Sequence, residues 1–183
     1  MNEIIRSMKE RRSVRRFRPE MPAKADLEQI VEAGLYAANG RGRQAVTVIA
    51  VTDRTLRDQI AEDNRKIGGW QEGFDPFYGA PVILIVLGDK ACPTEVYDGS
   101  LVMGNLMLAA HSLGLGSIWI HRAKEEFESE GYRQLLSDLG VEGEWLGVGH
   151  CAVGYADGEV PAPAKRRENR VFWSNKHPQG ESA

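Results

Sequence analysis

Hydrophobic residues follow two different periods along the chain, and the change of period separates helices from strands. Ile4, Ile5 and Met8 recur at helical spacing, whereas VTVIAVT at 46–52 is a β-branched run typical of a strand. The run VILIVLG after Pro81 is apolar throughout, as in strands that are covered on both faces. We predict further helices over 26–38, 54–66, 97–113 and 125–139, the first two capped by Asp26 and Asp53, and further strands over 117–120 and 146–153.

Helices alternate with covered strands, which predicts a sheet between two helical layers. The 183 residues, 42% of them hydrophobic, suit one domain over 1–183, since chains usually divide only beyond about 250 residues. From about residue 156 the chain is rich in proline, glycine and charge, which indicates a C-terminal extension over 156–183. Its apolar cluster Val171-Phe172-Trp173 is expected to pack either on this body or on a second copy.

The net charge of −3 hides two basic ends on an acidic body. Residues 1–20 hold seven Lys or Arg against three Glu, and residues 162–176 hold five against one, so each end carries a net +4. Two confined clusters favour a local anion site over a nucleic-acid surface, which usually spreads its positive charge over a broad face. Solvated charge runs are the alternative on composition alone.

The N-terminus and the cysteine content indicate a mature cytoplasmic protein. The first 17 residues carry charges where a signal peptide has its apolar core, and no window approaches the roughly 18 apolar residues of a membrane span. Cys92 and Cys151 are too few for a disulfide framework or a cysteine-rich metal site. We expect neither a membrane nor a nucleic acid among the partners.

Three common kinds of site are disfavoured. Gly147-Val148-Gly149-His150-Cys151-Ala152 matches the letters of a dinucleotide fingerprint, but these letters lie inside a predicted strand, with no helix after them. The glycines are expected to let a neighbouring backbone or a flat ligand approach closely. No nucleophile elbow occurs, and ligand spacing is lacking among His111, His121, His150 and His177. Any chemistry would then belong to a bound organic cofactor.

The segment Arg11-Arg12-Ser13-Val14-Arg15-Arg16-Phe17 carries the most specific signal. Guanidinium groups hold a phosphate dianion through forked, charge-assisted hydrogen bonds, and a serine hydroxyl adds a neutral donor. The segment resembles the opening motif of the nitroreductase family of FMN-dependent oxidoreductases. Three later stretches resemble that family in the same order: 37–44, 98–120 with Gly104-Asn105-Leu106, and 163–173 with Lys165-Arg166-Arg167.

The resemblance implies an α+β fold: a three-layer sandwich with a central mixed β-sheet flanked by helices, in a homodimer whose C-terminal extensions wrap the partner subunits. It implies FMN as cofactor, with Arg11, Lys165 and Arg167 at the phosphate and Ser13 at the phosphate or ribityl chain. Arg15 falls where the family sets a cation beside the flavin N1 and C2 carbonyl, which would stabilise the negative charge of a reduced flavin. The other candidate cofactor contacts are Arg12, Asn39, Gln44, Ile120, His121 and Arg122.

Three features of this chain leave its details open. Ile120-His121-Arg122 occupies the position that lines the isoalloxazine, but familiar relatives carry Glu-Gly there, so a general-acid role for His121 is a hypothesis. Arg12, Arg16 and Arg18 are also expected to be solvated or paired. The loop 67–79 is rich in glycine and aromatic residues, which form either a lid for flat substrates or ordinary loop anchors: Trp70, Phe74, Phe77 and Tyr78.

The activity implied by the resemblance is a two-stage electron transfer in one pocket. NADH or NADPH delivers hydride to the flavin and leaves, and a nitroaromatic, quinone or activated alkene is then reduced by a ping-pong mechanism. One alternative is a flavin-binding carrier or sensor without efficient turnover. Another is a specialised branch of the same fold that performs dehalogenation or flavin breakdown.

Overall fold

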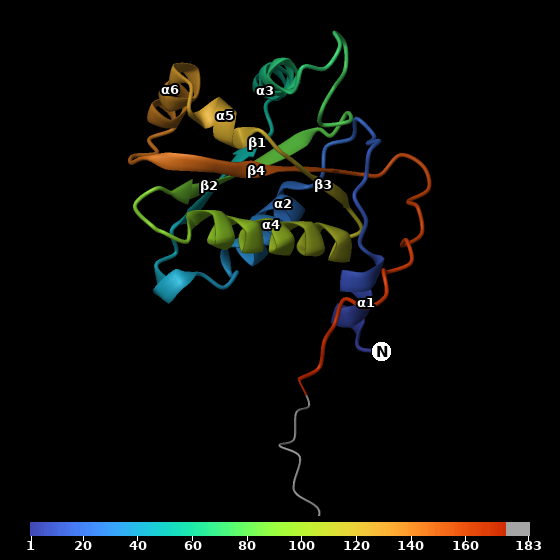
Figure 1. Cartoon of the computed structure of the whole chain (residues 1–183). Coiled ribbons are helices and arrows are strands. Elements are labelled where there is room, and N and C mark those ends of the chain that lie inside the picture. The colour runs from blue at the N-terminus through green and yellow to red at the C-terminus, as the bar shows by residue number, and fades with distance from the viewer. Residues whose placement is uncertain (175–183) are drawn as a thin grey trace, which may run out of the picture.

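The computed structural model describes residues 1–174 and shows a sheet between two layers of helices (Figure 1). The strands lie in the order β1 (Val46–Val51), β2 (Val82–Asp89), β4 (Trp145–Gly154) and β3 (Gly116–Ile120). All three neighbouring pairs are antiparallel, and the parallel pairing in the described part of the chain is a single bridge between Ser13 and Ser117. The α+β sandwich is confirmed. The sheet was expected to mix parallel and antiparallel pairs, and in residues 1–174 its parallel part is that bridge alone.

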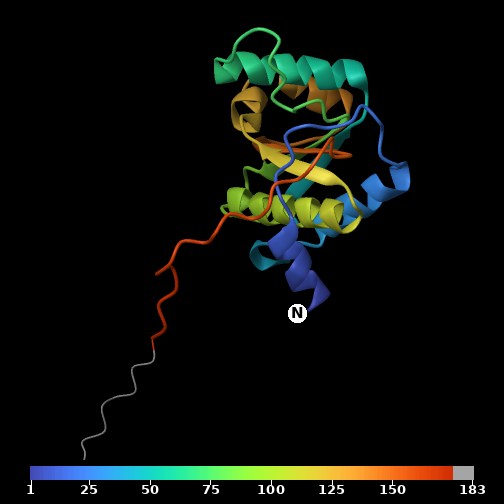
Figure 2. The ribbon, with the colours of Figure 1, turned by 90° about the vertical axis from the view of Figure 1, so that its right-hand side faces the viewer.

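Helices cover both faces of the sheet (Figures 1 and 2). One layer contains α2 (Lys24–Leu35) and α4 (Glu95–Ser112), and the other contains α3 (Arg54–Gly68), α5 (Ala123–Phe127) and α6 (Glu130–Asp138). Because successive strand residues point to opposite faces, Ile83 and Ile85 of β2 join the core beneath α3, α5 and α6, and Leu84 and Val86 join the core above α2 and α4. The central strand is therefore buried on both sides, as its unbroken apolar run predicts.

Two predicted helices differ from the structure. α2 begins at Lys24 with Ala23 as N-cap, so the prediction of Asp26 as the cap is wrong; Asp26 lies in the first turn, where a carboxylate still favours the positive end of the helix dipole. The predicted helix over 125–139 is two helices, because Ser129 interrupts it and donates its hydroxyl to the carbonyl of Glu126 at 2.7 Å. Asp53 caps α3 as expected, accepting from the amide of Leu56 at 2.8 Å.

The chain after β4 leaves the body without forming a helix or strand up to residue 174 (Figure 1). Val171, Phe172 and Trp173 are exposed, with 81% of Trp173 accessible, so packing of this cluster on its own body is wrong. Packing on a second copy stays a prediction. Lys176 and His177 lie outside the described residues. None of the helices within residues 1–174 is both long and apolar enough to cross a membrane.

Candidate functional site

The opening basic segment is held between the start of β3 and the chain that follows β4. The amide of Val14 donates to the carbonyl of Ser117 at 3.1 Å, and Phe17 forms a bridge with Ala156. Val14 and Phe17 are buried, which pins the segment to the sheet and leaves the side chains of Arg15 and Arg16 exposed. The structure thus brings Ser13 and Arg15 to the strand that ends at Ile120.

Arg11 and Arg12 join the C-terminal end of α1 (Glu3–Glu10) to this segment. Arg12 donates to the carbonyls of Lys9, at 2.6 Å, and of Arg11, so it is paired as expected. Arg11 is half-buried, and its Nη1 has no hydrogen-bond partner among residues 1–174; Nε of Arg12 is in the same condition. Burial, together with the neighbouring charge of Arg12, lowers the pKa of Arg11.

A third donor lacks a partner on the adjacent strand. Nε1 of Trp119 is buried without an acceptor in the described chain, and both Trp119 and Arg11 lie next to Cys151 of β4. A buried donor without an acceptor costs about 1–3 kcal/mol. Nε1 of Trp119 lies against Gly149 of β4, whereas the two charged donors of Arg11 and Arg12 are adjacent in the chain and suit anionic oxygens such as those of the FMN phosphate. Burial raises the pKa of the Cys151 thiol to about 12, so Cys151 is a packed side chain and not a nucleophile.

The glycines of β4 allow the close approach that the sequence predicts. A Cβ at Gly149 would collide with the indole of Trp119, and a Cβ at Gly147 would collide with the backbone carbonyl of Ala123. The lack of a side chain at Gly149 and Gly147 therefore lets β3 and the start of α5 lie tightly against β4.

Arg15 lines a hollow of about 450 Å³ together with Ser13 and residues 156–161. Its neighbour Arg16 is tied to Asp157 by a 2.8 Å ion pair, as expected for a paired arginine. Arg15 has no ion pair within residues 1–174, so its charge is available to a ligand or to a second subunit.

The turn from β3 into α5 carries Ile120, His121 and Arg122. Ile120 is buried, His121 is exposed with its ring 5.8 Å from that of Trp119, and Arg122 adopts a left-handed backbone with φ of 83°. That conformation explains why familiar relatives have glycine here: glycine adopts it freely, whereas arginine incurs about 1–2 kcal/mol of strain. The guanidinium of Arg122 stacks over the ring of Trp70 at 4.5 Å.

A buried polar network beneath this turn escaped the sequence analysis. Nδ2 of Asn64 donates to the carbonyl of His121 at 2.9 Å and to Oε1 of Glu126 at 2.8 Å. Oε2 of Glu126 lies 2.7 Å from Nε2 of His150. Asn64 follows Ile60 by four residues, so a polar side chain on the buried face of α3 was the available signal.

Asn39 and Gln44 are brought together, but at the other end of α4. The amide of Gln44 donates to Oδ1 of Asn39 at 2.9 Å, and the amide of Gly40 donates to both carboxylate oxygens of Asp98, at 3.0 and 3.1 Å. Thr94 also donates to Asp98, at 2.9 Å, so the loop is docked on the first turn of α4. Figure 1 shows the 40–42 turn and α1 near opposite ends of α4.

The C-terminal basic pair is not brought to the opening arginines within one chain. Lys165 pairs with Glu168 at 3.1 Å, and neither Lys165 nor Arg167 makes a described hydrogen bond or ion pair with residues 11–18. Both residues belong to the exposed stretch 157–174, which leaves the body after the bridge between Ala156 and Phe17. Convergence of the two basic ends on one ligand remains a prediction.

The aromatic residues of the 67–79 loop divide into two groups. Phe77 is completely buried, with its ring 5.3 Å from His150, so its assignment to a lid is wrong and it anchors the loop in the core. Trp70, Phe74 and Tyr78 are partly exposed and form a row with ring separations of 5.2 and 6.0 Å. This row begins at the β3–α5 turn, since Trp70 contacts Arg122.

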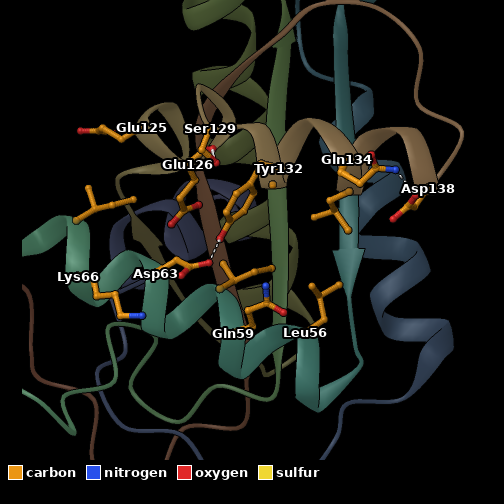
Figure 3. Close-up of a pocket in the computed structure, with 14 residues that line it drawn as sticks. Leu56, Gln59, Asp63, Lys66, Glu125, Glu126, Ser129, Tyr132, Gln134 and Asp138 are labelled. Atoms are coloured by element: carbon orange, nitrogen blue, oxygen red, sulfur yellow. Dashed lines mark hydrogen bonds between the residues drawn. The ribbon is translucent and has the colours of Figure 1, made fainter.

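A separate hollow of about 570 Å³ lies between α3 and the α5–α6 pair (Figure 3). Tyr132 spans it and donates to Asp63 at 3.3 Å, and burial raises the pKa of Tyr132. The residues that line this hollow include none of the sequence-predicted site residues. It is therefore distinct from the site along β3.

Comparison with known proteins agrees with this geometry. The sequence model of the nitroreductase family matches residues 8–155. The FMN reductase (NAD(P)H) of Bacillus subtilis is 30% identical over 140 residues, which are 64% of this chain and 53% of that protein, so the chain spans about half the length of this relative. The iodotyrosine deiodinase of Thermotoga neapolitana is 31% identical over 128 residues, 60% of this chain and 69% of that protein.

A solved structure extends the likeness over nearly the whole chain. The FMN-bound nitroreductase from Bacteroides fragilis superposes with a TM-score of 0.86 at 26% identity, covering 94% of this chain and 99% of that one. Sequence and fold therefore agree with the resemblance carried by the opening basic segment, and the chain belongs to the nitroreductase family.

Proposed function

We propose that this chain is an FMN-dependent oxidoreductase that takes hydride from NAD(P)H and reduces nitroaromatic, quinone or activated-alkene acceptors by a ping-pong mechanism. The observation that carries the proposal is the pair of buried, unpartnered donors on Arg11 and Arg12. They lie beside β3 on a fold shared with an FMN-bound nitroreductase. The B. subtilis relative, an NAD(P)H-dependent FMN reductase by name, supports the choice of electron donor. The proposal includes the cytoplasmic location expected from the sequence.

In this proposal one flavin site is assembled from two copies of the chain. Arg11 and Ser13 hold the phosphate, and Arg15 lies nearer the ring. Asn39 and Gln44 are docked at the far end of α4, so they reach a flavin bound along β3 only from a second copy. The exposed apolar side chains of Ile4, Ile5 and Met8 on α1, a helix without a single buried residue, support such an interface.

A hollow on the body is suited to receive the C-terminal extension of a second copy. Between α2 and the edge strand β1 lies a largely apolar hollow of about 890 Å³, with Glu28 and Glu32 in its lining. We assign it to the apolar cluster 171–173 of a second copy, because the hollow is largely apolar and Arg170, which directly precedes the cluster, complements Glu32; Glu28 is already paired with Lys24 at 3.3 Å. An edge strand also needs a cover against unwanted pairing. A chain ending at residue 160 should then run as a monomer in size-exclusion chromatography, whereas an unchanged dimer would remove the assignment.

FMN would supply two-electron hydride chemistry, which no described side chain provides. The chain contributes binding, orientation and charge. Arg15 places a fixed cation where negative charge develops, and covering by a second copy would lower the local dielectric and strengthen its effect. His121, exposed at the end of β3, is the candidate proton donor to an acceptor. His121→Ala should alter the pH profile of acceptor reduction, and an unchanged profile would remove that role.

The first experiment is a visible spectrum of the purified protein. We expect a flavin spectrum that NAD(P)H bleaches rapidly under anaerobic conditions and that a quinone restores. Slow or absent bleaching of a tightly bound flavin would instead indicate a carrier or sensor. The T. neapolitana relative makes halogenated phenols a necessary part of the acceptor panel, since dehalogenation is the alternative activity. A colourless protein that stays flavin-free in excess FMN would overturn the proposal.

A further inference from the structure

The buried network beneath the β3–α5 turn takes no part in binding or chemistry as proposed above, yet it joins three elements. Asn64 comes from α3, Glu126 from α5 and His150 from β4. Glu126 is 1% exposed and the other two are fully buried. Burying a carboxylate and two polar side chains in an apolar core costs free energy. Their presence here therefore indicates a structural or functional role.

We propose that Asn64 is a positioning residue for the flavin-lining turn, and that Glu126 and His150 hold it in place. The amide nitrogen of Asn64 donates to the carbonyl of His121 and to Glu126, which uses both of its hydrogens. The orientation of the amide is thereby fixed, because a flipped side chain would set its oxygen against two acceptors. The inference rests on the proposed flavin site along β3 and the turn that follows it.

The turn needs such an anchor because of its backbone. Arg122 is left-handed at φ of 83°, a conformation that a non-glycine residue keeps only when its surroundings enforce it. Three contacts enforce it: the amide of Asn64 on the carbonyl of His121, the stacking of Arg122 on Trp70, and the amide of Glu126 on the carbonyl of Arg122 at 3.1 Å. Two of the three come from α3 or the residues that follow it.

The anchor itself is held from behind. Glu126 accepts from Asn64 through Oε1, and its Oε2 lies 2.7 Å from Nε2 of His150, a close contact without hydrogen-bond geometry. The ring of Phe77 packs edge-on against His150. These side chains are at most 1% exposed, although Glu126 also lines the hollow between α3 and the α5–α6 pair, so we expect a displacement of Glu126 or His150 to be passed to Asn64 and from there to the turn. The network thus couples the core below the sheet edge to the backbone that would face the isoalloxazine.

The test compares Asn64→Leu with Asn105→Leu. Asn105 also donates its side-chain amide to a backbone carbonyl, that of Ala33 at 3.1 Å, but between α2 and α4. In the flavin-free protein, amide hydrogen exchange over 120–126 should become about tenfold faster in Asn64→Leu and stay unchanged in Asn105→Leu. With FMN bound, Asn64→Leu should change the visible circular dichroism of the flavin and slow its reduction by NADH about tenfold, while Kd for FMN changes less than about threefold.

Two further variants separate positioning from mere stability. Glu126→Gln can still accept from Asn64 and should retain wild-type exchange and spectra, whereas Glu126→Leu should resemble Asn64→Leu. Adding Arg122→Gly to Asn64→Leu should restore part of the reduction rate, since glycine adopts the left-handed backbone without an anchor. If Asn64→Leu does not fold, Asn64→Ala carries the same expectation without added bulk.

The outcomes distinguish this inference from the function on which it rests. Unchanged exchange over 120–126 in both Asn64 variants would overturn the positioning role, whether or not FMN binds. Faster exchange in a chain that binds no FMN would leave the anchor intact and overturn the flavin site. Equal losses in Asn64→Leu and Asn105→Leu would reduce the network to general stability and would also overturn the inference.

Discussion

The two regions that the resemblance assigns to the flavin, the opening segment 11–15 and the loop 39–44, differ in how they satisfy their own polar groups. The opening segment leaves buried donors of Arg11 and Arg12 without acceptors. In the loop, Asn39 receives the amide of Gln44, and Asp98 receives that of Gly40. In the proposed site, the first region would receive an anion at these donors, whereas the backbone of the second is already held by Asn39 and Asp98.

This difference, together with their separation along α4, indicates a division of labour. An unpartnered buried donor costs about 1–3 kcal/mol, which a phosphate oxygen would return on binding. No unpartnered buried donor is found in the loop 39–44, which would contribute a preformed surface from the other copy.

Arg11→Ala should have the largest effect, on FMN affinity. Loss of a charge-assisted contact to the phosphate is worth about 2–3 kcal/mol, which corresponds to a rise in Kd of roughly 30- to 150-fold. Fluorescence titration with FMN and with riboflavin, which lacks the phosphate, measures it; riboflavin affinity should hardly change. Arg16→Ala, which removes an exposed arginine paired with Asp157, is the matched control. Equal losses for FMN and riboflavin would contradict a phosphate role for Arg11.

Mixing two variants that bind FMN weakly should restore activity at a limiting FMN concentration if one site draws on two copies. Arg11→Ala and a loop variant carrying Asn39→Ala with Gln44→Ala are unfolded and refolded together. Random pairing gives mixed dimers in which one site carries both lesions and the other is intact, so about a quarter of all sites should recover. Each variant refolded alone is the control. Recovery no greater than the sum of the controls would place both regions in the site of a single chain.

The opening segment also shows what sequence alone could establish. Arginines and a serine in that order predicted an anion site, and the resemblance supplied the family and the three-layer fold, both of which are confirmed. The choice between lid and anchor stayed open for Phe77, because burial inside an aromatic-rich loop has no sequence signal. Asn64 was missed because its partners, His121 and Glu126, lie more than 50 residues away, and only the packing of α3 on the β3–α5 turn brings them together.

Helix ends were harder to predict than the elements themselves. Ser129 splits the predicted helix over 125–139, because its hydroxyl donates to the carbonyl of Glu126 and so competes with continuation of the helix. The spacing of apolar residues does not reveal this break. The separation of Asn39 from Arg11 was likewise invisible, since it depends on the path of α4 between them. Local patterns therefore predicted the elements and an anion site, whereas the distance between Asn39 and Arg11 depends on long-range contacts that only the structure shows.

Arg15→Ala should act on catalysis more than on retention of the cofactor. Arg15 makes no ion pair in residues 1–174 and lines the hollow beside 156–161, so its loss removes charge without breaking the fold. We expect the rate of flavin reduction by NAD(P)H to fall about tenfold to a hundredfold, a loss of a few kcal/mol at most, while Kd for FMN rises much less. Stopped-flow reduction and fluorescence titration on the same samples give the two values. Equal losses would make Arg15 a tether.

The smallest effect is the most direct test of the contrast, because it concerns the protein without flavin. Asn39→Ala removes a hydrogen bond that is already made, so the free energy of unfolding should fall by about 1 kcal/mol, which lowers Tm by roughly 2–4 °C in a chain of this size. Arg11→Ala removes a half-buried donor without a partner, so Tm of the flavin-free protein should stay the same or rise. Thermal unfolding followed by circular dichroism measures both, and excess FMN should reverse the order by stabilising Asn39→Ala and not Arg11→Ala. A flavin-free Arg11→Ala that loses as much stability as Asn39→Ala would show that Arg11 is already satisfied, and the two regions would then no longer differ in kind.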